Sequence, residues 1–235
     1  MKLKLIEKRQ EARGTKTFFW ETETPVEYLP GQYYYFTLPK LNYEDPRGAT
    51  RHFTIASSPT EGNILRLTTR IREESGFKKT LDELPIGTEI EGEGPSGTLI
   101  LDEKTKEQMP TANHIFIAGG IGITPFRSFI KYNIDKSLNI PMHLIYSNGD
   151  NDFVFKKELE EWDKKYDFIK VNFFNTSKSG HLDEKVLSPL YTKYKSLNPT
   201  WWIVGPPAFT TAMEEIMEKM KIASSQIHSE KFTGY

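Results

Sequence analysis

The stretch HIFIAGGIGITP, residues 114–125, passes from an apolar run through a glycine-rich loop into the start of a predicted helix. Glycines at 119, 120 and 122 allow positive φ and a close approach of the backbone to a phosphate. Thr124 suits an N-cap and Pro125 the first helical position, so a helix N-terminus is expected to face an anion. Pro125 also replaces the third glycine of the G-x-G-x-x-G pattern. A turn whose glycines serve only close packing is therefore the alternative.

A second loop of this kind follows the apolar run 201–204. Gly205, Pro206 and Pro207 open a predicted helix over 208–220, in which apolar residues recur at helical spacing. Parallel α/β sheets bind ligands at the carboxyl ends of their strands. Two such loops after two strands favour a nucleotide cleft more than either loop alone.

The second half of the chain alternates predicted strands with predicted helices, which indicates a parallel sheet with helices on both faces. The strands are expected over 114–118, 142–146, 168–174 and 201–204. The helices are expected from 125, over 155–165 and over 208–220.

The first hundred residues consist of short predicted strands separated by Gly and Pro turns, one of them Gly94-Pro95-Ser96-Gly97. This pattern indicates a small antiparallel barrel or sandwich. The strands are expected over 15–22, 32–38, 63–72 and 88–93. The polar stretch 102–111 separates the two patterns, so we place the domains at 1–106 and 107–235.

Composition narrows the classes of function. The chain has 235 residues with 31 Lys and Arg against 32 Asp and Glu, so no nucleic-acid partner is expected. No run approaches the roughly 20 apolar residues of a membrane span, and the N-terminus lacks a signal-peptide pattern. We therefore expect a cytoplasmic protein without a membrane partner. The sequence does not indicate an oligomeric state.

The chain contains no cysteine, which excludes disulfides, cysteine-ligated iron–sulfur clusters and thiol catalysis. Any acceptor of single electrons must then be another molecule. The histidines show no metal-ligand spacing, and Asp150 with Asp152 is better explained as an acidic loop, so no metal site is expected.

The segment Arg51-His52-Phe53-Thr54 has the residue types that a flavin requires. Arg51 offers a fork for a phosphate, Phe53 a flat apolar face for a ring, and Thr54 a hydroxyl for ring nitrogens. An edge strand with an exposed arginine is the alternative. The segment 75–80 is expected to begin a short helix aimed at a second phosphate, or to be a solvated turn.

Together these segments resemble the ferredoxin–NADP⁺ reductase superfamily. Their order and spacing match, as do Pro30-Gly31-Gln32 before the flavin motif and the aromatic, glycine-containing end of the chain, 230–235. The resemblance implies an N-terminal FAD-binding β-barrel and a C-terminal NAD(P)-binding α/β domain. It implies that a hydride passes from NADH or NADPH to FAD, and then electrons to a separate acceptor such as ferredoxin, flavodoxin, an oxygenase component or a small molecule.

The resemblance also implies roles for residues. Thr54 by flavin N5, Thr124 by the nicotinamide, Glu230 and Phe232 form the expected catalytic set. The residues expected to bind FAD or the nucleotide are Arg51, His52, Phe53, Thr54, Thr69, Gly76, Phe77, Lys78, Gly119, Gly120, Gly122, Ile123, Thr124, Pro125, Gly205, Pro206, Pro207, Phe232 and Tyr235. Of these, Phe232 or Tyr235 is expected to cover the flavin until the nicotinamide displaces it.

Two departures keep alternatives open. The family commonly has a cysteine where Val204 stands, so slower turnover or a non-catalytic flavin- or nucleotide-sensing module is an alternative to a reductase. An electron-transfer subunit of a larger complex is another. The segment 147–150 lacks an arginine for a 2′-phosphate and adds Asp150, which favours NADH, although Lys178 and His181 in the next loop offer compensating charge.

Overall fold

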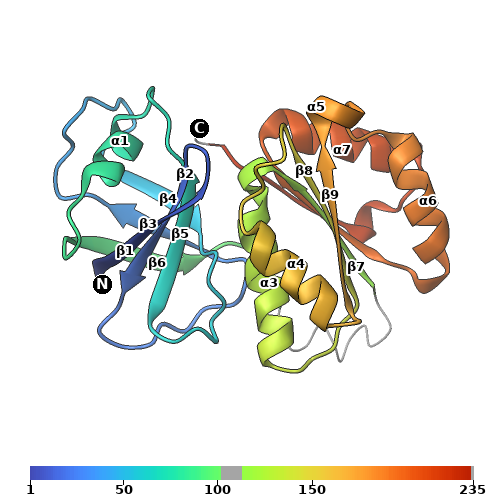
Figure 1. Ribbon diagram of the computed structural model, residues 1–235, viewed down its shortest axis with the longest axis horizontal. Coiled ribbons are helices and arrows are strands. Elements are labelled where there is room, and N and C mark those ends of the chain that lie inside the picture. The colour runs from blue at the N-terminus through green and yellow to red at the C-terminus, as the bar shows by residue number, and fades with distance from the viewer. Residues whose placement is uncertain (102–112, 234–235) are drawn as a thin grey trace.

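The computed structural model describes residues 1–101 and 113–233 and shows a strand-rich part beside a part in which helices flank a sheet (Figure 1). The N-terminal part holds a six-stranded antiparallel sheet in the order β4-β3-β6-β1-β2-β5, and the C-terminal part a five-stranded parallel sheet in the order β11-β10-β7-β8-β9. Both predicted sheet types are confirmed. The proposed boundary between residues 106 and 107 lies outside the described residues.

The N-terminal sheet closes on itself through a bridge between Ile55, just after β4, and Leu67 of β5. Its strands are β1 (Lys2–Ala12), β2 (Thr15–Glu21), β3 (Tyr33–Thr37), β4 (Thr50–Thr54), β5 (Ile64–Arg70) and β6 (Glu89–Ser96), and α1 (Gly76–Glu83) follows β5. Strand β1 was not predicted; in its first half, charged residues alternate with buried Leu3 and Leu5. The turn predicted at residues 94–97 is wrong in part, because β6 continues to Ser96, which pairs with Tyr33 of β3.

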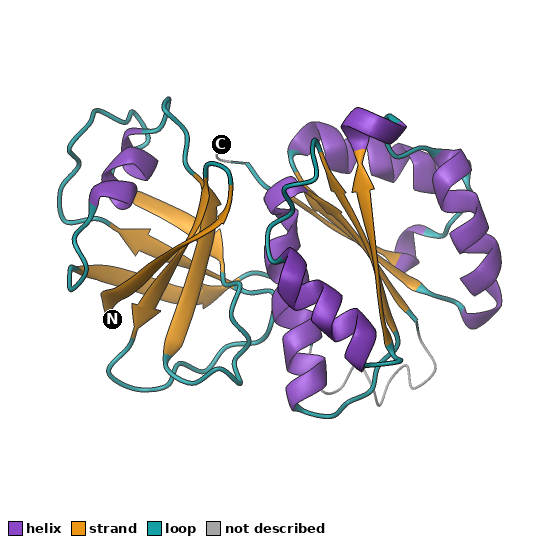
Figure 2. Cartoon of the chain, viewed as in Figure 1, coloured by secondary structure: helices purple, strands orange, loops and turns teal. Residues whose placement is uncertain are grey.

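The C-terminal sheet is covered on both faces (Figure 2). One apolar cluster packs α3 and α4 on one face, and a second packs α6 and α7 on the other. The strands are β7 (His114–Gly119), β8 (Met142–Asn148), β9 (Ile169–Asn175), β10 (Thr200–Gly205) and β11 (Ile227–Lys231). The helices are α3 (Ile123–Asp135), α4 (Lys156–Lys165), α5 (Thr176–Ser179), α6 (Glu184–Tyr194) and α7 (Pro207–Lys219), with 3-10 turns η1 (Gly120–Gly122), η2 (Lys195–Leu197) and η3 (Ser224–Gln226).

The start of α3 differs from the prediction. The helix begins at Ile123 with Gly122 as N-cap, because the turn η1 leads directly into it. Thr124 is therefore not the N-cap, and its hydroxyl donates to the carbonyl of Ile121 at 3.2 Å. Pro125 lies third in the helix, still in the first turn, where its missing N–H has no intrahelical partner to lose.

The two parts contact each other at separate places. Arg127 of α3 binds the loop between β4 and β5, and its side chain is fully buried. At the turn between β1 and β2, Arg13 bonds Asp150 and Asp152, and this arginine is largely exposed. Within residues 1–101 and 113–233, no helix is long and apolar enough to cross a membrane.

Candidate functional site

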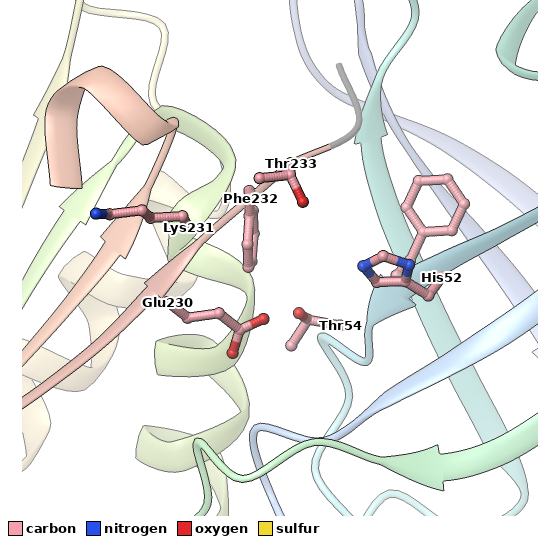
Figure 3. Close-up of a pocket in the computed structure, with 7 residues that line it drawn as sticks. His52, Thr54, Glu230, Lys231, Phe232 and Thr233 are labelled. Atoms are coloured by element: carbon pink, nitrogen blue, oxygen red, sulfur yellow. The ribbon is translucent and has the colours of Figure 1, made fainter. Parts of the chain in front are cut away.

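A small cavity of about 50 Å³ lies where the end of β4 meets the C-terminal strand. Figure 3 shows Thr54 and the carboxylate of Glu230 on opposite sides of this cavity, with Phe232 beside them. The lining residues are His52, Phe53, Thr54, Glu230, Lys231, Phe232 and Thr233. The fold thus brings together three of the four residues of the expected catalytic set, although Thr54 and Glu230 are 176 positions apart in the sequence.

Glu230 is held at the cavity by strand pairing. It lies on β11 opposite Val204 of β10, and the amide of Phe232 donates to the carbonyl of Gly205 at 2.9 Å. Burial raises the pKa of Glu230 to about 7. The carboxyl group can therefore hold or release a proton near neutral pH, which suits proton exchange beside a redox centre. Val204 itself is fully buried in the apolar cluster that Phe232 packs against.

The side chains of β4 alternate between two environments. His52 is exposed and packs against Tyr33 and Tyr35, with ring centroids 4.9 and 5.7 Å away. Phe53 lies on the opposite side of the strand, with its centroid 6.0 Å from those of both Phe36 and Phe77. Phe53 is thus partly used in the barrel core, and its contact with a flavin ring stays a prediction.

Arg51 is buried, with 7% of its side chain exposed, and its described partners belong to the protein. It donates to the carboxylate of Asp45 and to the carbonyls of Arg47, Gly48 and Thr50. Arg51 is therefore not the exposed arginine of the alternative interpretation. Its contact with a phosphate remains a prediction.

Asp45 also binds the start of α1. Its Oδ2 accepts from the amide of Phe77 at 3.0 Å and from the hydroxyl of Ser75 at 3.2 Å. The predicted short helix at this segment is confirmed, and Ser75 caps it by accepting from the amide of Lys78. Gly76 is needed here, because a Cβ would lie 2.3 Å from the carbonyl oxygen of Glu44. Asp45 is not among the site residues predicted from the sequence.

Several cations nevertheless lie near the start of α1. Lys78 is buried, and burial together with Arg72, Arg47 and Arg51 lowers its pKa to about 8. Asp45 is one carboxylate among these cations, so an anionic group is electrostatically favourable at this place. This charge distribution fits the phosphates of a flavin nucleotide, provided that the loop of Asp45 gives way.

The glycines of the two C-terminal loops have different roles. A Cβ on Gly122 would lie 2.2 Å from the carbonyl oxygen of Val204, so this glycine serves the close packing of η1 against β10. A Cβ on Gly205 would lie 3.2 Å from the Cα of Gly119, so the two loops are in contact. Gly120 has a φ of +54° and open space around it. Close packing is therefore confirmed for Gly122 and Gly205, and the approach of a phosphate to Gly120 stays a prediction.

An open pocket of about 550 Å³ lies at the carboxyl ends of the parallel strands. It contains Gly119, Gly120 and Pro206 of the predicted set, and its walls are largely apolar. The other lining residues are Ser147, Asn148, Gly149, Thr176, His181, Leu182, Ala208, Phe209, Ala212 and Met213. A pocket of this size, with a positive-φ glycine at its edge, fits a dinucleotide that has phosphates and an aromatic base.

The remaining predicted residues lie around these two sites. The open pocket is not lined by four of the predicted residues. Three of them are buried in the first turn of α3, and the fourth begins α7: Ile123, Thr124, Pro125 and Pro207. Thr69 is buried on β5, the strand against which η1 packs. Tyr235 lies outside the described residues.

Two family models match the chain, one for each part. Residues 2–100 match the oxidoreductase FAD-binding domain, and residues 116–215 match the oxidoreductase NAD-binding domain. The chain therefore carries an oxidoreductase FAD-binding domain followed by an oxidoreductase NAD-binding domain.

Solved structures of other proteins show the same two-domain fold. Ferredoxin-NADP⁺ reductase from Plasmodium falciparum shares the fold with a TM-score of 0.77 at 19% identity, over 98% of this chain and 95% of that protein. The chain therefore has the two-domain fold of that reductase.

Some relatives in sequence are named as components of oxygenase systems. The glycine betaine monooxygenase reductase subunit of Chromohalobacter salexigens is 23% identical over 238 residues, covering 95% of this chain and 61% of the relative. The ferredoxin reductase component of 3-ketosteroid-9-alpha-monooxygenase from Mycobacterium tuberculosis is 27% identical over 214 residues, covering 88% of this chain and 55% of the relative. This chain thus spans between 55% and 61% of the length of these two relatives.

Proposed function

We propose that this protein is an NAD(P)H-dependent flavin oxidoreductase that supplies electrons to a separate acceptor. The observation that carries the proposal is the meeting of Thr54, at the end of the FAD-domain strand, with Glu230 on the C-terminal strand, at one cavity. The FAD-binding and NAD-binding family matches supply the class of cofactor. The bound flavin would accept a hydride from the nicotinamide and release electrons singly or in pairs.

The chain's own residues would bind and orient the cofactors. Thr54 would offer its hydroxyl to the flavin ring, and the cations around Lys78 would neutralise the flavin phosphates. Gly120 would let the backbone approach the nucleotide phosphates in the open pocket. Glu230, with a pKa of about 7, would exchange a proton at its carboxyl oxygen beside the ring.

We further propose NADH as the preferred nucleotide. In the loop after β8, Oδ1 of Asp150 accepts from the side chain of Asn148 and from the amide of Asp152. This ordered carboxylate lies next to the pocket residue Gly149, and it would repel a 2′-phosphate. Arg13 pairs with Oδ2 of Asp150 at 3.3 Å, and Lys178 of α5, two residues beyond the pocket residue Thr176, is a further cation that would offset the repulsion.

Anaerobic mixing tests the proposal. Purified protein loaded with FAD is mixed with NADH or NADPH, and the flavin absorbance is followed with time. We expect rapid bleaching by NADH and slower bleaching by NADPH. A protein that binds no flavin after FAD is added would exclude the function, and a protein that binds both cofactors without bleaching would be a sensor.

A subunit of a larger electron-transfer complex is the second candidate. It is favoured by the names of the relatives, which are a reductase subunit and a reductase component, and by the fraction of their length that this chain spans. An oxygenase component, a ferredoxin or a flavodoxin would be the acceptor. Affinity purification from the native host at endogenous level tests this candidate, with a stoichiometric redox protein as the expected co-purifying partner.

A further inference from the structure

Arg127 uses its whole side chain at the contact between the two domains. A guanidinium has five N–H donors. Here Nε and Nη2 donate to Glu158 at 2.8 and 2.6 Å, Nη1 and Nη2 donate to Glu61 at 2.7 and 3.1 Å, and Nη1 also donates to the carbonyl of Ala56 at 2.7 Å. The side chain is 0% exposed. A lysine, with three donors on one nitrogen, cannot reproduce this set.

These bonds join the two segments on which the proposed chemistry depends. Ala56 lies two residues beyond Thr54, and Arg127 lies three residues beyond Thr124. The next residue along α3 adds a parallel bond, since the hydroxyl of Ser128 donates to the carbonyl of Ser57 at 2.7 Å. The segment after the predicted flavin strand is thus bonded directly to the first turns of the helix that follows the predicted nicotinamide loop.

The charges around Arg127 balance. Arg66 pairs with Glu61 at 2.7 Å, so two arginines face Glu61 and Glu158. Burial opposes the charge on Arg127, but the hydrogen bonds and charges of the two glutamates outweigh it and raise the pKa of the guanidinium. The guanidinium of Arg127 therefore stays charged throughout the pH range in which the protein would work.

Stability alone does not account for such a cluster. Buried ion pairs contribute little net stability compared with apolar residues of the same volume, because desolvation offsets the attraction between the charges. Two of the five bonds hold the guanidinium on Glu158 of α4, in its own domain, and the other three reach Glu61 and Ala56 of the FAD domain and so fix an orientation. Phe155 and Trp162 confine the guanidinium, with ring centroids 5.5 and 5.7 Å from its central carbon. Orientation is what hydride transfer between two separately bound rings requires.

We propose that Arg127 is a positioning residue for hydride transfer. It sets the placement of the NAD-binding loop against the FAD-binding strand and touches neither cofactor. This inference rests on the proposed function. Misplacement of reacting groups by about 1 Å is enough to slow a reaction roughly 100-fold. Loss of the hydrogen bonds from Arg127 should therefore slow flavin reduction without weakening the binding of either cofactor.

The first test compares R127K with wild type and with D135N as matched control. Asp135 lies at the far end of α3 and accepts from Thr60 of the other domain, so D135N also alters a contact between the domains by replacing a charged acceptor with an amide. We expect R127K to lower the limiting rate of flavin reduction about 100-fold and to weaken the charge-transfer absorbance of the flavin–nicotinamide pair. Affinities for FAD and for ADP-ribose should change less than about twofold, and D135N should resemble wild type.

A second test needs no cofactor. Because the sequence has no cysteine, E91C together with K185C provides two unique spin-label positions, exposed and one in each domain. We expect the distance distribution between the labels to broaden in R127K and to stay narrow in wild type and D135N. Should R127K fail to fold, E61Q replaces it, because Arg127 stays in place and loses its charged partner from the FAD domain.

A variant with a narrow distance distribution and a wild-type limiting rate would overturn the inference. So would a slow variant whose FAD affinity has fallen in proportion, since that describes damage to the flavin site. These results are distinct from failure of the proposed function, in which wild-type protein binds no flavin or is not reduced by either nucleotide.

Discussion

The two candidate cofactor sites differ in how far their phosphate-binding groups are already used. At the start of α1, the amide of Phe77 and the guanidinium of Arg51 are bound to Asp45. At the carboxyl end of the parallel sheet, Gly120 faces open space in a pocket of about 550 Å³. In the proposed binding mode, the flavin phosphates would compete with the carboxylate of Asp45, whereas the nicotinamide nucleotide would enter a pocket that is already formed. Flavin binding would then be coupled to movement of the loop that holds Asp45, and nucleotide binding would not be coupled to such a movement.

The strongest test of this difference removes Asp45. D45A leaves buried Arg51 without its counter-charge, so we expect the free energy of unfolding of the flavin-free protein to fall by about 3 kcal/mol. FAD should then raise the Tm of D45A more than that of wild type, because its phosphates take the position of the carboxylate. Denaturant unfolding and thermal shift with FAD measure both effects.

The control for D45A is E44A, at an exposed neighbouring side chain, with an expected change within about 0.5 kcal/mol. Equal losses in the two variants, or the same Tm gain from FAD in D45A and wild type, would show that Asp45 does not compete with the flavin.

The preformed pocket is tested by two alanines in one loop. G122A places a Cβ 2.2 Å from the carbonyl oxygen of Val204, so we expect a loss of about 2 kcal/mol or more in the free energy of unfolding. G120A meets no neighbour within 4 Å and should lose only about 1 kcal/mol through its positive φ.

Nucleotide affinity should separate these variants further, since G120A adds a methyl group where the phosphates approach. Calorimetric titration of folded G120A with NAD⁺ should show weaker binding than wild type. Unchanged affinity would mean that the phosphates lie elsewhere in the pocket.

A smaller effect is expected from the proton on Glu230. Its pKa in the folded protein is about 7 against an ordinary value of 4.5, so the folded state binds the proton more tightly than the unfolded state. The resulting stabilisation is complete below pH 4.5 and is lost as the pH rises to about 7. E230Q should flatten this slope in denaturant unfolding at several pH values, whereas E214Q, at a glutamate whose pKa is lowered, should leave it.

The smallest change is expected from V204C. Cysteine is slightly smaller than valine and tolerates burial, so the free energy of unfolding should change by less than about 1 kcal/mol. The thiol restores a weak donor beside Glu230, and we expect stopped-flow reduction of the flavin to be faster than in wild type. An unchanged rate would show that valine is fully competent at this strand end.

Periodic segments were predictable and tertiary contacts were not. Both sheets were identified from the aromatic and threonine residues of β2 and β3, the apolar alternation of β5 and the apolar runs of β7 and β10. The strand β1 was missed because Lys and Glu stand between its buried leucines, and α6 carries an internal proline, Pro189. Strand β11 is short and mostly polar, so its pairing with β10 is visible only in the fold.

The residues missed in the sites share one property. Asp45 binds a helix start 32 positions away, and Arg127 binds Glu61 at a separation of 66 and Glu158 at 31. No local pattern marks such partners, because each side chain alone resembles a solvated charge. Arg51, in contrast, was found because its neighbours in sequence resemble a known motif, although its partner was not.

Two of the contacts between the domains respond differently to the solvent. The exposed pair of Arg13 and Asp150 is 87% and 47% accessible, so dissolved ions screen it, whereas the cluster around Arg127 is shielded from them. Added salt would thus weaken the first contact and leave the second in place. The turn between β1 and β2 would then separate from the loop after β8 while the segments beside Thr54 and Thr124 stay together, so ionic strength would act on the periphery of the interface and not on its centre.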